Sequence, residues 1–166
     1  MEIHRIDFMH IPIDIFTDGA CSHNPGPGAW GFFIPLCPPS GEPFHQEGFV
    51  TETTNNRMEL LAVIKALEWF QEHQHSAAAH LRIFSDSTYV VHGITTWIHG
   101  WVKNNWRTSQ KKPVENKDLW ERLLEVSEKY SQLSFHWIRG HNGHPENEAV
   151  DSFVQECIQK NKKNRL

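Results

Sequence analysis

The sequence has few cysteines, no long apolar run and no excess of positive charge. Its 166 residues include 3 cysteines, too few and too odd a number for a disulfide framework. No apolar stretch reaches the length of a membrane span. Residues 1–16 mix charges and histidines into their apolar positions, so they resemble neither a secretory signal nor a basic transit peptide. We therefore expect a soluble, cytoplasmic protein from a reducing compartment, with no membrane partner.

The net charge of -4 comes from 16 Lys and Arg against 20 Asp and Glu, and at first it disfavours a nucleic-acid partner. The charge is unevenly distributed, however. Segment 102–117 has five basic residues and one acidic residue, and the tail 159–166 has four basic residues. Elsewhere 19 acidic residues face 7 basic ones. The sequence thus predicts an acidic body with a basic protrusion at 102–117 and a basic tail at 159–166.

The length and the 39% share of hydrophobic residues are typical of one globular domain, here residues 1–166. Apolar alternation predicts a first strand that ends at Asp18, a turn over 19–28, and strands over 29–36 and 44–52 that complete an antiparallel meander. Helical periodicity and further apolar runs predict a helix from Asn56 to about 73, a strand over 81–86, two short helices within 88–102, a helix over 118–130, a strand over 133–138 and a helix from Pro145. This order predicts an α/β fold, a mixed sheet with helices on its faces.

Two aspartates, Asp18 and Asp86, each end a predicted apolar strand. Ligands bind at the carboxyl ends of strands in open α/β sheets, and two such aspartates on adjacent strands would lie side by side. Two negative charges at such a short distance repel each other unless a cation neutralises them. Hard cations such as Mg²⁺ or Mn²⁺ prefer oxygen ligands. Glu59 and Asp151 flank the apolar stripes of their helices and can lean toward the same place.

Each of these acids also has a purely structural interpretation. Asp18 and Asp86 are also suited to bonding their own backbone in turns. Glu59 lies three residues after Asn56, the spacing of a capping box. Asp151 also suits a solvated helix position. The metal-site hypothesis rests on all four acids converging.

Several ordered segments resemble type 1 ribonuclease H, close to its bacterial form. They run from about residue 12 to 155 and read TDGAC (17–21), NPGPG (24–28), TTNNRME (53–59), DS (86–87), GITTWI (93–98), KPV (112–114), DLW (118–120) and GHNGHPENE (140–148). The resemblance implies a ribonuclease H-like fold, a five-stranded mixed β-sheet flanked by α-helices. It also implies endonucleolytic cleavage of the RNA strand of RNA–DNA hybrids.

The resemblance assigns metal binding to Asp18, Glu59, Asp86 and Asp151, and it places a histidine of a mobile loop at His141. Two Mg²⁺ ions, or Mn²⁺, held by these acids would activate water and stabilise the leaving oxygen. A histidine titrates near neutral pH and is suited to proton transfer to or from the leaving group. The alternative is a plain loop histidine, or a zinc site with His144.

Four residues resemble the substrate-contacting positions of the family: Asn24, Thr54, Asn55 and Asn56. The basic protrusion resembles the family's handle, which grips DNA phosphates with salt-sensitive affinity, and its candidate contacts are Trp101, Lys103, Trp106, Lys111 and Lys112. The asparagines are also suited to helix capping, and the tryptophans to packing the protrusion onto the body.

The chain departs from the resemblance in places. Its handle reads VKNN at 102–105, which is less basic than is common in the family. Thr88 stands where a Gln is frequent, and residues 1–10 precede the usual start of the family's sequences. Two alternatives to a ribonuclease H are a hybrid-binding module without catalysis and a nuclease of related fold acting on DNA junctions. The complete set of acids argues against the first, and TTNNRME (53–59) and the handle argue against the second. We expect the enzyme to act as a monomer with no obligatory protein partner.

Overall fold

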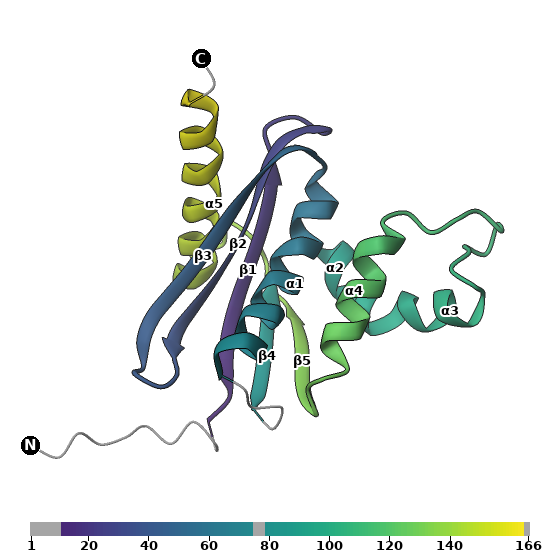
Figure 1. Ribbon diagram of the computed structural model, residues 1–166, viewed down its shortest axis with the longest axis horizontal. Helices are drawn as coiled ribbons and strands as arrows, with labels where there is room; N and C mark the ends of the chain where they lie inside the picture. The colour runs from purple at the N-terminus through teal and green to yellow at the C-terminus, as the bar shows by residue number, and fades with distance from the viewer. Residues whose placement is uncertain (1–10, 75–78, 165–166) are drawn as a thin grey trace, which may run out of the picture.

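A computed structural model describes residues 11–74 and 79–164. The overhang 1–10, residues 75–78 of the linker before the fourth strand and the last two residues of the basic tail lie outside this range. Within it the chain forms one five-stranded mixed sheet with helices on both faces, which confirms the expected fold class (Figure 1).

Strand β1 (Ile13–Cys21) lies at the centre of the sheet, whose order is β3-β2-β1-β4-β5. Strands β2 (Gly26–Cys37) and β3 (Glu42–Thr53) continue from it as an antiparallel meander, as the alternating pattern predicts. On the other side of β1, strands β4 (His80–Ser85) and β5 (Gln132–Trp137) run parallel to it and to each other. The carboxyl ends of β1 and β4 therefore point the same way.

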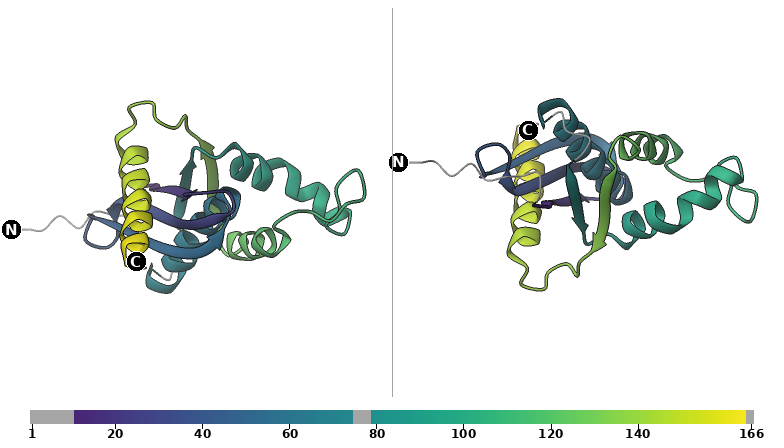
Figure 2. Two further views of the ribbon diagram at one scale, coloured as in Figure 1. Left: turned by 90° about the horizontal axis from the view of Figure 1, so that it is seen from above. Right: turned by 90° about the horizontal axis from the view of Figure 1, so that it is seen from below.

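Helices cover the two faces unequally. Helix α1 (Asn55–Gln74) packs on one face with α4 (Lys117–Ser127) beside it, and α5 (Pro145–Lys163) packs on the opposite face over β1, β2 and β3 (Figure 2). Helix α2 (Thr88–His92), a π-helical turn η1 (Gly93–Trp97) and α3 (Ile98–Lys103) follow one another without a break, where two separate short helices were expected. Among the described residues, no helix is both long enough and apolar enough to cross a membrane.

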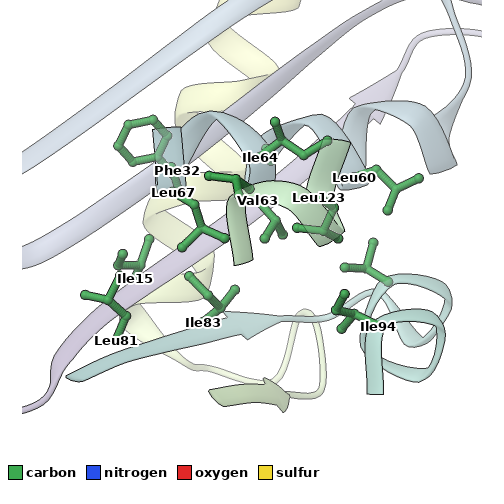
Figure 3. Close-up of a cluster of buried hydrophobic side chains, with 14 of the residues drawn as sticks. Ile15, Phe32, Leu60, Val63, Ile64, Leu67, Leu81, Ile83, Ile94 and Leu123 are labelled. Atoms are coloured by element: carbon green, nitrogen blue, oxygen red, sulfur yellow. The ribbon is translucent and has the colours of Figure 1, made fainter. Parts of the chain in front are cut away.

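The main core lies between α1 and the sheet (Figure 3). The apolar face of α1, for example Leu60 and Leu67, packs there with side chains from β1 and β4 such as Ile15 and Leu81, all fully buried. Burying one such side chain contributes roughly 1.5–3 kcal/mol. The core thus fixes α1 firmly against β1, which contains Asp18, and β4, which Asp86 directly follows.

The basic protrusion projects from the body as α3 and the loop 104–116 that leads to α4 (Figure 1). Its base is held by aromatic rings: Trp120 is fully buried, and Trp101 packs against it with ring centroids 5.3 Å apart. Trp106 packs in turn on Trp101, at 6.4 Å. The expectation that tryptophans pack the protrusion onto the body is therefore met by these three residues.

Candidate active site

The β1–β4 pairing brings Asp18 and Asp86 together. Thr17 and Ser85 are partners in the parallel register, so the residues that follow them lie side by side. The prediction that the first strand ends at Asp18 is wrong, because antiparallel pairing with β2 continues as far as Cys21. Asp18 is therefore held within a strand and is not a turn residue, whereas Asp86 directly follows the last residue of β4.

Glu59 reaches the same place from α1. A Cβ atom added to Gly19 would lie 2.2 Å from the backbone carbon of Met58 and 2.4 Å from the backbone nitrogen of Glu59, so only glycine permits this approach of β1 to α1. The capping-box alternative for Glu59 is wrong. The helix begins one residue before Asn56, and its cap is Thr54, whose Oγ1 accepts a hydrogen bond from the Arg57 backbone N–H at 3.2 Å.

Carboxylate oxygens of Asp18, Glu59 and Asp86 all lie within 4.8 Å of one another. Burial, and then the charge of Asp86, raise the pKa of Asp18 to about 7. Burial and the charge of Asp18 raise the pKa of Glu59 well above its usual value. Asp18 is 5% exposed and Glu59 9%. The site thus concentrates negative charge in a position that water cannot stabilise.

One atom of this group lacks a partner. Glu59 Oε2 is buried and accepts no hydrogen bond from the protein. A buried carboxylate oxygen without a donor costs free energy unless a cation or a proton meets it. The donor set is entirely carboxylate oxygen, the type that Mg²⁺ and Mn²⁺ prefer. The residues present therefore fit a divalent cation.

Asp151 and His141 lie at the edge of this acidic group. Asp151, half-buried on α5, is close enough for its charge to raise the pKa of both Asp18 and Asp86. His141 lies in the exposed loop between β5 and α5 with a left-handed φ of 54°, and its charge lowers the pKa of Asp86. The structure therefore brings the four acids and His141 into one region.

The zinc alternative finds no support in residues 11–74 and 79–164. The only group there with three ligand atoms in metal-binding proximity is formed by Asp18, Glu59 and Asp86. His144 lies away from any such group: its Nδ1 is 3.3 Å from a carboxylate oxygen of Glu146 without a hydrogen bond, and its ring packs on that of Phe16.

Two further residues support Asp86, and neither was predicted from the sequence. Burial raises the pKa of Asp86, and Asn147, only 3% exposed, reduces that rise through a hydrogen bond to the Asp86 carboxylate. Trp137 donates its indole N–H to the backbone oxygen of Asp86 at 3.0 Å. Asn147 was detectable in principle, because it shares the buried stripe of α5 with Val150 and Val154, where a polar residue needs a partner.

Beside the acids is an open pocket of about 440 Å³, which we call the asparagine pocket. Its lining residues are Asn24, Thr54, Asn55, Asn56, Glu115 and Asn116. The Asn55 side chain accepts the Cys21 backbone N–H at 2.8 Å, and the Asn24 side chain accepts the Asn55 backbone N–H at 3.3 Å. The structure thus brings the four predicted substrate-contacting residues together and adds two from the segment before α4.

The handle residues lie apart from the acids, on the projecting segment. Lys103 ends α3, while Lys111 and Lys112 lie in the loop, and all three side chains are exposed. Trp101 and Trp106 are partly buried in the aromatic packing described above. The protrusion thus presents a second, basic surface apart from the acids.

Comparison with known proteins gives the family. The RNase H family model matches residues 11–159. A ribonuclease H of Dechloromonas aromatica is 49% identical over 147 residues, which cover 89% of this chain and 93% of that relative. A ribonuclease H of a Bradyrhizobium species is 45% identical over 146 residues, covering 88% and 89% of the two chains.

Solved structures show the same fold. LC9-RNase H1, described as a type 1 RNase H with the type 2 active-site motif, superposes with a TM-score of 0.76 at 27% identity, covering 90% of this chain and 72% of that one. An N-terminal RNase H domain from Mycobacterium tuberculosis superposes with a TM-score of 0.70 at 16% identity, covering 94% and 99%.

A mixed sheet with one carboxylate in its central strand, another directly after the neighbouring parallel strand and a third from the helix above them defines an α/β enzyme with a site suited to divalent metal. Within that class, the chain belongs to the RNase H family, in its bacterial form, and is a ribonuclease H.

Proposed function

We propose that this protein hydrolyses the RNA strand of RNA–DNA hybrids endonucleolytically, with divalent metal held by Asp18, Glu59, Asp86 and Asp151. The observation that carries the proposal is the group of three carboxylates within 4.8 Å, two of them buried and the third, Asp86, half-buried, in which Oε2 of Glu59 has no hydrogen-bond partner. Family membership supports the same conclusion.

In this proposal Asp18, Glu59 and Asp86 hold the metal, and Asp151 flanks them from α5. Two bound Mg²⁺ ions, or Mn²⁺, would supply an activated water and stabilise the leaving oxygen of an in-line displacement at phosphorus. His141, whose loop lies beside Asp86, exchanges a proton with the leaving group. Asn147 and Trp137 hold Asp86 in position.

The asparagine pocket and the handle divide the recognition of the hybrid. The amides of Asn24, Asn55 and Asn56 can donate and accept, which suits sugar hydroxyls and base edges in a minor groove. The 2′-hydroxyl is the group that distinguishes the RNA strand. Lys103, Lys111 and Lys112 contact phosphates of the DNA strand, and Trp101 and Trp106 offer ring surface beside them. LC11-RNase H1, of the same fold at a TM-score of 0.67, has been solved in complex with an RNA/DNA hybrid.

The proposal requires no second chain, since the acids, the pocket and the handle all come from this one. We therefore expect a monomer without an obligatory protein partner. The cysteines in the described residues are free thiols, which suits the cytoplasm. Residues 1–166 act as one domain in this view.

The test is cleavage of an end-labelled RNA–DNA hybrid, with RNA duplex, DNA duplex and a DNA junction as competing substrates. We expect RNA-strand cleavage with Mg²⁺ or Mn²⁺, none with EDTA, and loss of activity in Asp18→Asn. Asp14→Asn is the matched control, because Asp14 lies on the same strand but pairs with Arg82, 2.6 Å away. Hybrid binding without turnover in either metal, or cleavage of the junction alone, contradicts the proposal.

A further inference from the structure

We propose that Arg57 is a positioning residue that holds the two walls of the asparagine pocket together and so sets the affinity for substrate. The inference rests on the proposed function, because it assumes that the pocket contacts the hybrid. Residue 57 does not itself line the pocket. Its effect on the reaction is therefore indirect, through the geometry of residues that do.

The two walls belong to segments far apart in the chain. One is the start of α1, Thr54 to Asn56, and the other is the pair Glu115 and Asn116 before α4. Arg57 follows the first wall directly and reaches the second, donating from Nη1 to Asn116 Oδ1 at 3.2 Å. It also donates from both terminal nitrogens to the carboxylate of Asp118, at 3.0 and 2.7 Å.

The second wall depends on such contacts because its backbone is unusual. Asn116 has a left-handed φ of 59°, an uncommon conformation that asparagine adopts more readily than most residues with a side chain. Its side-chain amide nitrogen donates to the Tyr89 hydroxyl at 3.0 Å, and the buried Trp120 donates to the same hydroxyl at 3.1 Å. Arg57 is the member of this network that joins Asn116 to α1.

The guanidinium of Arg57 makes three hydrogen bonds to these acceptors, all from its two terminal nitrogens. Hydrogen bonding to Asp118 raises the pKa of Arg57, and the same contact holds the pKa of Asp118 below its usual value. A two-point pair of this kind fixes orientation as well as distance. An arginine so engaged is a brace for the pocket and supplies no phosphate contact of its own.

The chain contains a matched pair for comparison. Arg122 of α4 donates to Glu68 of α1 through Nε and Nη2, at 2.6 and 2.8 Å. It joins the same two helices in the same two-point manner, with a similarly exposed arginine side chain, 41% against 34% for Arg57. Neither Arg122 nor Glu68 lines the asparagine pocket. Removing either arginine therefore deletes one ion pair between α1 and α4, but only the removal of Arg57 also deletes a hydrogen bond to a residue that lines the asparagine pocket.

The experiment compares Arg57→Ala with Arg122→Ala in steady-state cleavage of a hybrid by the full chain in Mg²⁺. We expect Arg57→Ala to raise KM on the order of tenfold with kcat nearly unchanged, a loss of about 1.4 kcal/mol in binding. Arg122→Ala should leave both constants near those of the wild type. Equal KM values for the two variants overturn the inference, and so does a fall in kcat alone.

Two further readouts separate bracing from direct binding of phosphate. The slope of log Kd against log salt should be the same for Arg57→Ala and the wild type. If Arg57 itself neutralised a phosphate, its removal would lower the slope by about 0.9, and that result would overturn the inference. Asp118→Ala should raise KM as Arg57→Ala does, and the double variant should add nothing, since the two residues act as one unit. Additive effects contradict the proposal. A wild-type chain that leaves hybrids intact would instead contradict the proposed function.

Discussion

Asp18 and Glu59 bring two buried carboxylates to one point, the first from within β1 and the second from the second turn of α1, with ligand oxygens no more than 4.8 Å apart. Neither group is stabilised by a basic partner: burial is the main cause that raises the pKa of both, the charge of Asp86 adds to it at Asp18, and the charge of Asp18 adds to it at Glu59. The arrangement therefore opposes folding when no cation is bound. Stability and metal binding should be linked in a measurable way.

The first prediction concerns pH and metal. The pKa of Asp18 rises from 3.8 to about 7 on folding. At pH values between these two, the carboxyl group keeps its proton in the folded state and has lost it in the unfolded state. The contribution of Asp18 to stability is thus fully present below pH 4 and is lost as pH rises through 7. At 1.36 kcal/mol per pKa unit, the loss by pH 8 is at most about 4 kcal/mol. Urea unfolding in EDTA at pH 5 and pH 8 measures the part of this loss that falls above pH 5, at most about 3 kcal/mol.

The control for this prediction is Asp18→Asn, which removes the titrating group. Without metal at pH 8 the variant should be more stable than the wild type, and at pH 5 the difference should shrink. Excess Mg²⁺ should stabilise the wild type at pH 8 much more than the variant, because only the wild type keeps the full ligand set. A wild type equally stable at both pH values, with and without Mg²⁺, would contradict the linkage.

The second prediction concerns the close contact between Gly19 of β1 and the backbone of α1, which brings Glu59 into the site. Gly19→Ala places a methyl group 2.2 Å from the backbone of Met58, and neither strand nor helix can yield without moving the core. We expect a loss of roughly 1–3 kcal/mol in stability, typical of overpacking, together with loss of most activity as Glu59 is displaced.

Gly100→Ala is the counterpart of that substitution. Gly100 lies in α3, and a Cβ there meets no atom within 4 Å. Alanine is favoured over glycine in a helix by roughly 0.5–1 kcal/mol, so this variant should be slightly more stable and should retain activity. Denaturant melts and hybrid cleavage on both variants make the comparison. Equal behaviour of the two would refute the role given to Gly19.

The third prediction concerns the support of Asp86 by Asn147. Asn147→Ala removes a hydrogen bond to a ligand carboxylate, and loss of such outer partners typically weakens metal affinity by about 10–100-fold. Titration calorimetry with Mn²⁺ on the substrate-free protein measures this without relying on turnover. Asn161→Ala, on the same helix, is the control, because its amide donates only to Cys157, to the backbone oxygen and the sulfur. An unchanged Mn²⁺ affinity in Asn147→Ala would remove Asn147 from the site.

Much of the fold and the acidic group was predictable because local patterns were sufficient. Period-two alternation marked the strands, and the rule that parallel strands present their carboxyl ends at one edge placed Asp18 beside Asp86. The end of β1 was not predictable in this way. The glycines and prolines of 19–28 signal a turn, but pairing with β2 extends the strand to Cys21, and that pairing is a non-local interaction.

The asparagine pocket shows the same limit of local reasoning. Asn24 and Asn55 stand in recognisable segments, and the structure confirms that they lie together. Glu115 was counted only as one acid within a basic stretch, yet it lines the pocket, and Asn116 was not singled out at all. Their placement depends on the left-handed backbone of Asn116 and on Arg57, which is remote in sequence. Contacts of this kind leave no periodic signature.

The last prediction concerns the protrusion. If Lys103, Lys111 and Lys112 contact phosphates, replacing all three with alanine should lower the slope of log Kd against log salt by about 0.9 for each phosphate that is no longer neutralised. Replacing Lys160, Lys162 and Lys163 at the end of α5 removes the same charge from a segment that suits the helix dipole, and should leave the slope unchanged. Binding of a hybrid to the two triple variants in EDTA, across a salt series, separates specific contact from net charge. Equal slopes in both would mean that the protrusion acts only through its contribution to total charge.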